Sequence, residues 1–131
     1  MTLQRLNEHL NMLLRLQEAT EILSALQVSK AANYDGMPHS HQVSRTTENI
    51  ALALRRQEDM VNRLERMVVS SEKEVREFVD SIPDPRTQTI FDLRFLCGMK
   101  WEAVARMIGG GNTATTVSMV CYRYIKSEEP E

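Results

Sequence analysis

Hydrophobic residues recur at helical spacing along most of the chain, and glycine and proline separate the stretches that carry the pattern. Between residues 47 and 82 there is neither glycine nor proline, and a seam of mostly apolar positions advances by alternating steps of four and three. This spacing is typical of a coiled-coil heptad and predicts one long helix over 47–82. The seam consists of Ile50, Leu54, Gln57, Val61, Leu64, Val68, Ser71, Val75, Phe78 and Ile82. Its two polar members are candidates for setting the register of pairing.

Residues 1–28 also lack glycine and proline and predict a second long helix. Its seam contains consecutive three-residue steps, which locally overwind a coiled coil. Two interpretations stay open: the two helices fold back on each other as an antiparallel hairpin, or the pair also dimerises or assembles further. The length of the second helix and the apolar pairs Leu13–Leu14 and Ile22–Leu23 favour dimerisation or higher assembly. The seam of residues 1–28 consists of Leu3, Leu6, Leu10, Leu13, Leu16, Ala19, Leu23 and Leu26.

The segment between these helices, residues 29–46, contains Gly36, Pro38 and several serines and threonines, which predicts a linker that is mobile or bound to a partner. Asp35, His39 and His41 offer metal-ligating side chains, although neighbouring polar groups in a loop are the commoner reading. We expect no metal and no other cofactor.

The last third of the chain predicts three short helices separated by glycine. Asp84 before Pro85 is an N-cap followed by proline at the first helical position, and this helix is expected to run to about Cys97, before Gly98. A second helix is indicated by apolar residues at i, i+3, i+4 and i+7 from Trp101. The glycines at 109–111 end it, because glycine adopts positive φ freely.

The third segment follows Asn112 or Thr113 as a cap and repeats the helical spacing from Val117 to Tyr124. Its β-branched and aromatic residues are also compatible with a strand. A strand would have no partner strand in this chain, which favours a helix. Two short helices joined by a glycine turn form a helix-turn-helix, so the whole pattern predicts an all-α protein.

The charge distribution is uneven. The chain has a net charge of −2, yet residues 82–126 carry six basic and three acidic side chains. The only net positive segment is therefore the one with the helix-turn-helix pattern, as expected for a face that binds DNA. The resulting domain boundaries are a helical hairpin at 1–82, a helix-turn-helix at 83–126 and an acidic tail at 127–131.

Residues 84–126 resemble the C-terminal helix-turn-helix of bacterial sigma factors, region four. They resemble more closely the sigma-like domain of small phage transcriptional regulators of Gram-positive hosts, the ArpU/RinA type. Leu93-Arg94-Phe95 precedes Gly98, and GMKWEAVA follows where relatives tend to carry G-x-S-W-E-E-I-A. Ala105 and Gly109 match the small residue and the turn glycine of such motifs, while Gly110, Gly111 and Asn112 make the turn about two residues longer. The N-terminal helices and Gly36-Met37-Pro38 are also similar to those proteins.

The resemblance implies a sequence-specific DNA-binding regulator of transcription that acts on double-stranded DNA, with RNA polymerase as a further partner. Residues on the outside of the third helix are expected to read the DNA, with hydroxyl and apolar contacts more prominent than bidentate arginine. The expected DNA-binding residues are Thr113, Thr115, Thr116, Ser118, Met119, Tyr122, Arg123 and Lys126. The expected phosphate contacts are Arg86, Lys100 and Arg106.

Each of these residues also has a plainer interpretation. Trp101 and Tyr124 are expected to be core anchors. Arg94 either pairs with Glu102 or contacts phosphate. In this plainer interpretation, Thr113, Thr115 and Ser118 form a polar face exposed to solvent. Arg123 and Lys126 then complement the helix dipole.

The sequence lacks the motifs that identify common classes of enzyme. No phosphate-binding loop, HExxH motif or nucleophile elbow occurs, so we do not expect an enzyme. Cys97 and Cys121 are expected to be ordinary thiols in a reducing compartment. No apolar run is long enough for a bilayer, and no leader pattern is present, which favours a soluble intracellular protein. The resemblance implies that it acts in the cytoplasm of a bacterial host. The alternative function is a phage assembly or DNA-packaging subunit, or an adaptor, that uses the same helices for protein contacts.

Overall fold

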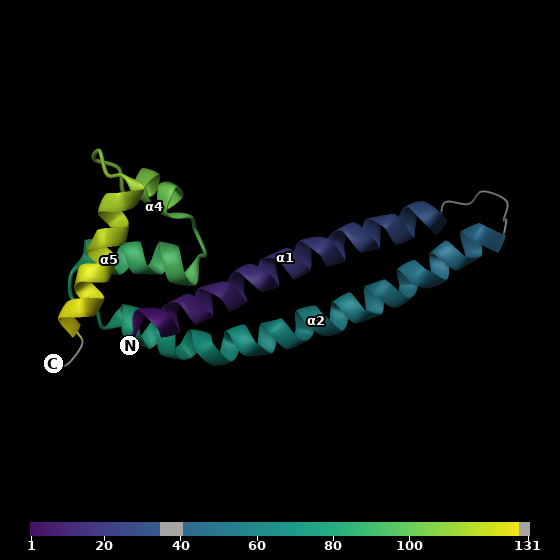
Figure 1. Ribbon diagram of the computed structural model, residues 1–131, viewed down its shortest axis with the longest axis horizontal. Coiled ribbons are helices and arrows are strands. Elements are labelled where there is room, and N and C mark those ends of the chain that lie inside the picture. The colour runs from purple at the N-terminus through teal and green to yellow at the C-terminus, as the bar shows by residue number, and fades with distance from the viewer. Residues whose placement is uncertain (35–40, 129–131) are drawn as a thin grey trace. The chain divides into compact units, whose positions relative to one another are not determined.

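All elements in the described part of the chain are helices. The computed structural model describes the backbone of residues 1–34 and 41–128 and the side chains of residues 1–31 and 46–128. Two long helices are followed by shorter ones (Figure 1), and the third glycine-bounded segment is a helix, not a strand, as the missing partner strand predicted. The elements are α1 (Leu3–Tyr34), α2 (His41–Asp80), α3 (Pro85–Phe91), the π-helix η1 (Asp92–Leu96), α4 (Trp101–Ile108) and α5 (Ala114–Glu128). The predicted all-α fold is confirmed.

The two long helices extend further into the predicted linker than expected, while α2 ends at Asp80, two residues before its predicted end. α1 continues to Tyr34 and α2 starts at His41, so the predicted linker 29–46 was too long. The reason is local, because glycine and proline in this segment occur only at Gly36 and Pro38. Residues 35–40 lie outside the described part of the chain, as do the side chains of the residues considered for metal binding.

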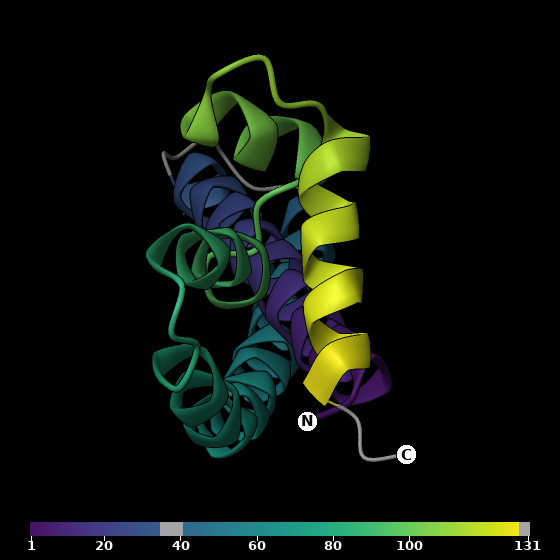
Figure 2. The ribbon, with the colours of Figure 1, turned by 90° about the vertical axis from the view of Figure 1, so that its left-hand side faces the viewer.

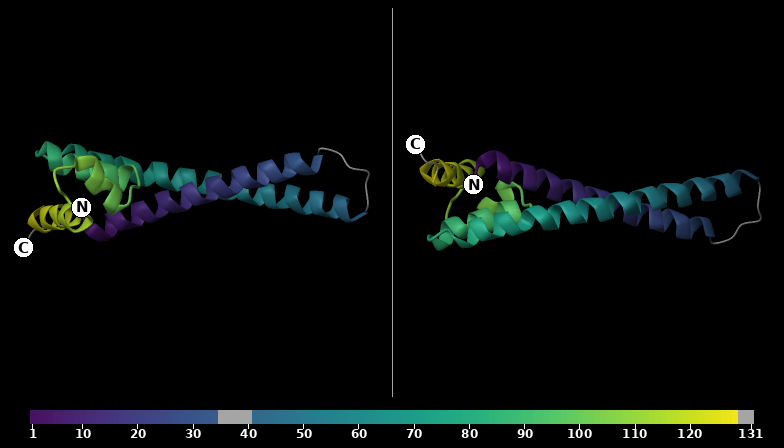
Figure 3. Two further views of the ribbon diagram at one scale, coloured as in Figure 1. Left: turned by 90° about the horizontal axis from the view of Figure 1, so that it is seen from above. Right: turned by 90° about the horizontal axis from the view of Figure 1, so that it is seen from below.

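Every seam position predicted in α2 is buried or half-buried, and so is every seam position predicted in α1. The two polar seam residues contact α1 of the same chain. Gln57 Nε2 donates a hydrogen bond to the Ala19 carbonyl oxygen at 3.0 Å, and Ser71 Oγ pairs with His9 Nδ1. An antiparallel hairpin therefore supplies partners for both polar seam positions. Figure 3 draws the two helices as ribbons in two further views.

The chain divides into two compact units whose boundaries lie within α1 and α2. The first unit comprises Met1–Leu14 with Val68–Glu131, and the second comprises Arg15–Met67. The cause is packing, because apolar residues from the start of α1 and the end of α2 join the core of the short helices. This core contains Leu6, Leu10, Val75, Val79, Ile82, Ile90, Phe91, Phe95, Val104, Ala105, Val117, Cys121 and Ile125.

The predicted helix from Pro85 to about Cys97 is continuous, but its second half is a π-helix. Asp84 caps it as predicted, because its carboxylate accepts a hydrogen bond from the Thr87 amide at 3.0 Å. Hydrogen bonds donated by the Thr87 hydroxyl and the Thr87 amide lower the pKa of Asp84. The Cys97 amide donates to the Asp92 carbonyl, five residues back, and Gly98 then ends the segment with a φ of 74°.

α5 runs on to Glu128, so the first two residues of the expected acidic tail are helical, and residues 129–131 lie outside the described part. Among the described helices, none combines the length and apolar character needed to cross a membrane.

Candidate nucleic-acid interface

α4 and α5 pack against each other through small and branched apolar side chains. Val104 and Ala105 of α4 and Val117, Cys121 and Ile125 of α5 are all buried. Figure 2 shows α4 lying near the N-terminal end of α5, which is drawn in yellow. α3 also contacts α5, so one side of α5 is covered along much of its length. The opposite side is left facing outward.

Three successive glycines make the turn between α4 and α5. Gly109, Gly110 and Gly111 have φ values of 72°, 64° and 76°, a region that other residues adopt only with strain. Gly109 combines this φ with a ψ of −157°, a conformation found almost solely in glycine. The longer glycine turn expected from the sequence is confirmed, and it ends α4 after Ile108.

A reciprocal pair of hydrogen bonds caps α5. The Thr116 amide donates to Thr113 Oγ1 at 3.3 Å, and the Thr113 amide donates to Thr116 Oγ1 at 2.8 Å. The Thr116 hydroxyl also donates to the Thr113 carbonyl oxygen at 2.9 Å. Thr116 is exposed, but its hydroxyl is already engaged within the cap, so it positions the start of α5.

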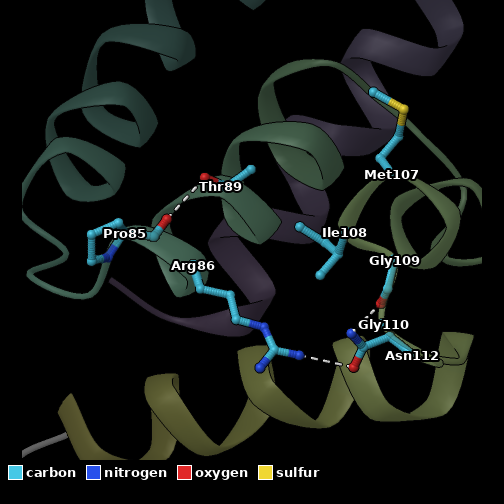
Figure 4. A pocket seen from close by; sticks show the side chains of 8 residues that line it. All are labelled: Pro85, Arg86, Thr89, Met107, Ile108, Gly109, Gly110 and Asn112. Atoms are coloured by element: carbon cyan, nitrogen blue, oxygen red, sulfur yellow. Dashed lines mark hydrogen bonds between the residues drawn. The ribbon is translucent and has the colours of Figure 1, made fainter.

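Arg86 of α3 is tied to this turn. Its guanidinium donates to Asn112 Oδ1 at 2.9 Å, and Asn112 Nδ2 donates in turn to the Gly109 carbonyl oxygen at 2.6 Å. Figure 4 shows these side chains beside an open pocket of about 500 Å³. The pocket is lined by Pro85, Arg86, Thr89, Met107, Ile108, Gly109, Gly110 and Asn112. Arg86, for which the sequence predicts a phosphate contact, braces the turn before α5 in the structure.

The predicted reading residues lie together on the outward side of α5. Thr115, Met119 and Tyr122 are exposed, with Met119 at 41% and Tyr122 at 44%, and Ser118 is half-buried. The Ser118 hydroxyl donates to the Thr115 carbonyl oxygen at 3.0 Å. Arg123 and Lys126 extend the same exposed surface toward the C-terminal end of α5. A mixed surface of hydroxyl, thioether, phenol and cationic groups therefore faces outward.

Tyr122 is also anchored to α4 through aromatic contacts. Its ring meets that of Trp101 edge-on, with centroids 6.3 Å apart, and Trp101 meets Phe95 in the same way at 6.3 Å. The Arg94 guanidinium lies over the Trp101 ring, 4.6 Å from its centroid. This stack connects η1, α4 and the outward side of α5.

Arg94 contacts Met99 and Trp101. Arg94 Nη1 donates to the Met99 carbonyl oxygen at 2.9 Å, while Nε is buried without a hydrogen-bond partner. Burial lowers the pKa of Arg94, and within the described residues it forms no ion pair with Glu102. The half-buried Arg94 is thus held by Trp101 and Met99, and the predicted pairing with Glu102 is not formed.

The predicted core anchors lie where expected. Trp101 is half-buried against Phe95, and Tyr124 packs against Phe91 at 5.7 Å and Phe78 at 6.1 Å between ring centroids. The two remaining predicted phosphate contacts, Lys100 at the N-cap of α4 and Arg106 in its last turn, are exposed.

The two cysteine thiols of the described part both have raised pKa values. Burial raises the pKa of Cys121 to about 12 and also raises that of the exposed Cys97, so both thiols stay protonated at neutral pH. No three potential ligands among the described His, Cys, Asp and Glu side chains come together as a metal site.

Comparisons with protein-family models, with curated proteins and with solved structures found no match to this chain.

Some residues that shape this site had no sequence signal. Asn112 was expected only as a possible cap, and its contact with Arg86 joins residues 26 positions apart. The partners of Arg94 depend on the π-helical turn, which brings its guanidinium over Trp101. Periodicity reports which face of a helix is covered but not which distant side chain meets it.

Proposed function

We propose that this chain is a sequence-specific DNA-binding regulator of transcription, of phage or prophage type, that acts in the cytoplasm of a bacterial host. The observation that supports the proposal most is the exposed outward side of α5. The opposite side of α5 packs against α4, and a glycine turn joins the two helices. This is the order of elements in a helix-turn-helix, where the second helix enters the major groove. The net positive charge of residues 82–126 supports the same assignment.

The chemistry of this surface supports base reading by small polar and apolar contacts. Thr115 and Ser118 offer hydroxyls to base edges, and Met119 offers an apolar contact to a thymine methyl group. Arg123 and Lys126 are free to contact phosphates, as are Lys100 and Arg106 on α4. Arg86 and Thr116 hold the turn and the cap, so their contribution is the placement of α5.

DNA binding is tested by fluorescence anisotropy of labelled DNA fragments from the protein's genomic neighbourhood, at low and moderate salt. We expect saturable binding to one fragment that weakens as salt increases. Replacing Arg123 and Tyr122 together by alanine should weaken that binding at least about tenfold, since a phosphate contact and an aromatic contact are lost. Lys73→Ala removes one positive charge from an exposed position on α2 and serves as the matched control.

A further variant separates base contact from packing. Tyr122→Phe keeps the ring against Trp101 and removes only the hydroxyl, so it should retain the fold and most of the affinity. Unchanged binding by the Arg123→Ala, Tyr122→Ala protein would contradict the proposal. Absence of binding at low salt would direct attention to protein contacts, as in the assembly or packaging role. RNA polymerase, the second proposed partner, is then tested by co-purification with the full chain.

A further inference from the structure

Arg94 is a half-buried cation without an acidic partner. Among the described residues it forms no ion pair, and its Nε is buried with no hydrogen-bond partner. A polar atom buried without a partner costs free energy, so the contacts that Arg94 does make have to offset that cost. These contacts therefore indicate the role of the side chain.

Both contacts of Arg94 lie where α4 begins. Its Nη1 donates to the Met99 carbonyl oxygen at 2.9 Å, and its guanidinium lies 4.6 Å from the centroid of the Trp101 ring. A planar guanidinium can stack on an aromatic face and donate a hydrogen bond from its edge at the same time. Phe95 meets the Trp101 ring edge-on at 6.3 Å. Arg94 and Phe95 both belong to η1, a π-helical turn of the kind often found at functional sites, and together they hold the Trp101 ring.

The Trp101 ring in turn supports Tyr122 on the outward side of α5. The centroids of these two rings are 6.3 Å apart, and their planes are inclined by 75°. Among the described residues, Trp101 is the only ring partner of Tyr122, which is otherwise 44% exposed. Burial lowers the pKa of Arg94 and Tyr122 opposes this change, as expected for side chains that lie near each other. Because an exposed side chain has several rotamers available, the contact with Trp101 selects one of them.

We propose that Arg94 is a positioning residue for DNA binding, which orients Tyr122 toward the DNA through Trp101 and does not itself contact phosphate. This inference rests on the regulator function proposed above and adds the side chain that holds one of its reading residues. A side chain that is already ordered loses less conformational freedom on binding, so it binds more tightly. Arg94 thus contributes to affinity at the base pair that Tyr122 contacts, whereas a phosphate contact contributes at every sequence alike.

Two substitutions of Arg94 distinguish positioning from phosphate contact. Arg94→Met keeps a long side chain without the charge, and Arg94→Lys keeps the charge without the planar group. Both should weaken binding to the DNA fragment that the wild type binds by at least about threefold, because Tyr122 is no longer held. Loss of a phosphate contact in Arg94→Met would make the salt dependence shallower by about 0.9 in the logarithmic slope. We expect the same slope in both variants as in the wild-type protein.

A double-mutant cycle tests whether Arg94 acts through Tyr122. Tyr122→Ala should weaken binding, and adding Arg94→Met to it should weaken binding further by less than about twofold. Arg106→Met is the matched control, because it makes the same substitution at an exposed position of α4. Its effect should be the same with and without Tyr122. When each base pair of the fragment is changed in turn, Arg94→Met and Tyr122→Ala should lose discrimination at the same position.

Trp101 is the only tryptophan of the chain, so its fluorescence reports the contact with Arg94 in the absence of DNA. Acrylamide is a neutral quencher. It should quench Trp101 more strongly in both Arg94 variants than in the wild type or in Arg106→Met, because the guanidinium no longer covers the ring. Circular dichroism and urea unfolding show whether each variant is folded under the binding conditions. If Arg94→Met does not fold, Arg94→Lys takes its place in the double-mutant cycle.

The outcomes separate this proposal from the proposed function. A wild-type protein that binds no DNA would overturn the regulator function and this proposal with it. If the wild type binds DNA, this proposal alone is overturned by wild-type affinity in Arg94→Lys or by a shallower salt slope in Arg94→Met. Equal effects of Arg94→Met with and without Tyr122, or unchanged quenching of Trp101 in both Arg94 variants, would overturn it as well.

Discussion

His9 is almost completely buried, with 1% of its surface exposed. It lies in α1 beside Ser71 of α2, and its Nδ1 pairs with the serine hydroxyl. Burial lowers the pKa of His9 below 6.5, and the nearby Arg5 acts in the same direction while Glu72 opposes both. The neutral imidazole is thus the form that fits between the two helices.

This environment predicts that the first unit is less stable in mild acid. The unfolded chain binds a proton at His9 near pH 6.5, whereas the folded chain binds it only at a lower pH. The contribution of neutral His9 to the free energy of unfolding is therefore at its full value above about pH 6.5. It decreases as the pH falls toward the lowered pKa of His9 in the folded chain. Urea unfolding at about pH 7.5 and about pH 5 should show a smaller pH dependence for His9→Gln than for the wild type. Equal pH dependences would show that His9 is not the titrating group; the other histidines are common to both proteins.

At the scale of elements, the turn between α4 and α5 depends on backbone geometry more than on contacts. A Cβ atom built on Gly109 would meet no other atom within 4 Å. Its φ of 72° and ψ of −157° are nevertheless unfavourable for any residue with a side chain. The cost of a substitution is thus strain in the chain, not a steric clash.

Gly109→Ala is expected to lower the free energy of unfolding by about 1–3 kcal/mol, as for other residues forced into sparsely populated backbone regions. Asparagine tolerates the left-handed helical region but not this one, so Gly109→Asn should not recover the loss. Chemical denaturation monitored by circular dichroism measures both variants. Met107→Ala, which alters a side chain exposed by 67% on the preceding helix, is the control and should change stability by less than about 0.5 kcal/mol. A neutral effect of Gly109→Ala would mean that the turn relaxes without cost.

Much of the element structure could be predicted because it depends on local pattern. The heptad spacing from Ile50 to Ile82 identified the buried side of α2, and Asp84 and Pro85 identified the start of α3. The ends of α1 and α2 could not be placed, since helix propensity near the loop continues past the last seam residue. The burial of His9, the π-helical turn and the Arg86–Asn112 contact also escaped prediction. They depend on which distant segment packs there, and no short-range periodicity encodes that.

At the scale of the whole molecule, the distribution of charge links DNA binding to the dimerisation that the sequence pattern favours. One copy offers few cations to DNA, because residues 82–126 carry only six basic side chains and Arg94 is held inside the unit. A dimer doubles the number of phosphates that one complex neutralises, and its two copies of α5 can contact two half-sites. Dimerisation of the chain would thus compensate for a sparse basic surface.

The salt dependence of DNA binding tests this link. The logarithm of the binding constant falls with the logarithm of salt concentration, with a slope of about −0.9 for each phosphate neutralised. Met60→Ser with Met67→Ser removes exposed apolar side chains of α2 and leaves the charge and α5 unchanged. A variant that sedimentation shows to be monomeric should have about half the slope of a dimeric wild-type protein. Equal slopes for a proven monomer and a proven dimer would mean that only one copy of α5 contacts DNA, because each additional phosphate contact must release its own counterions.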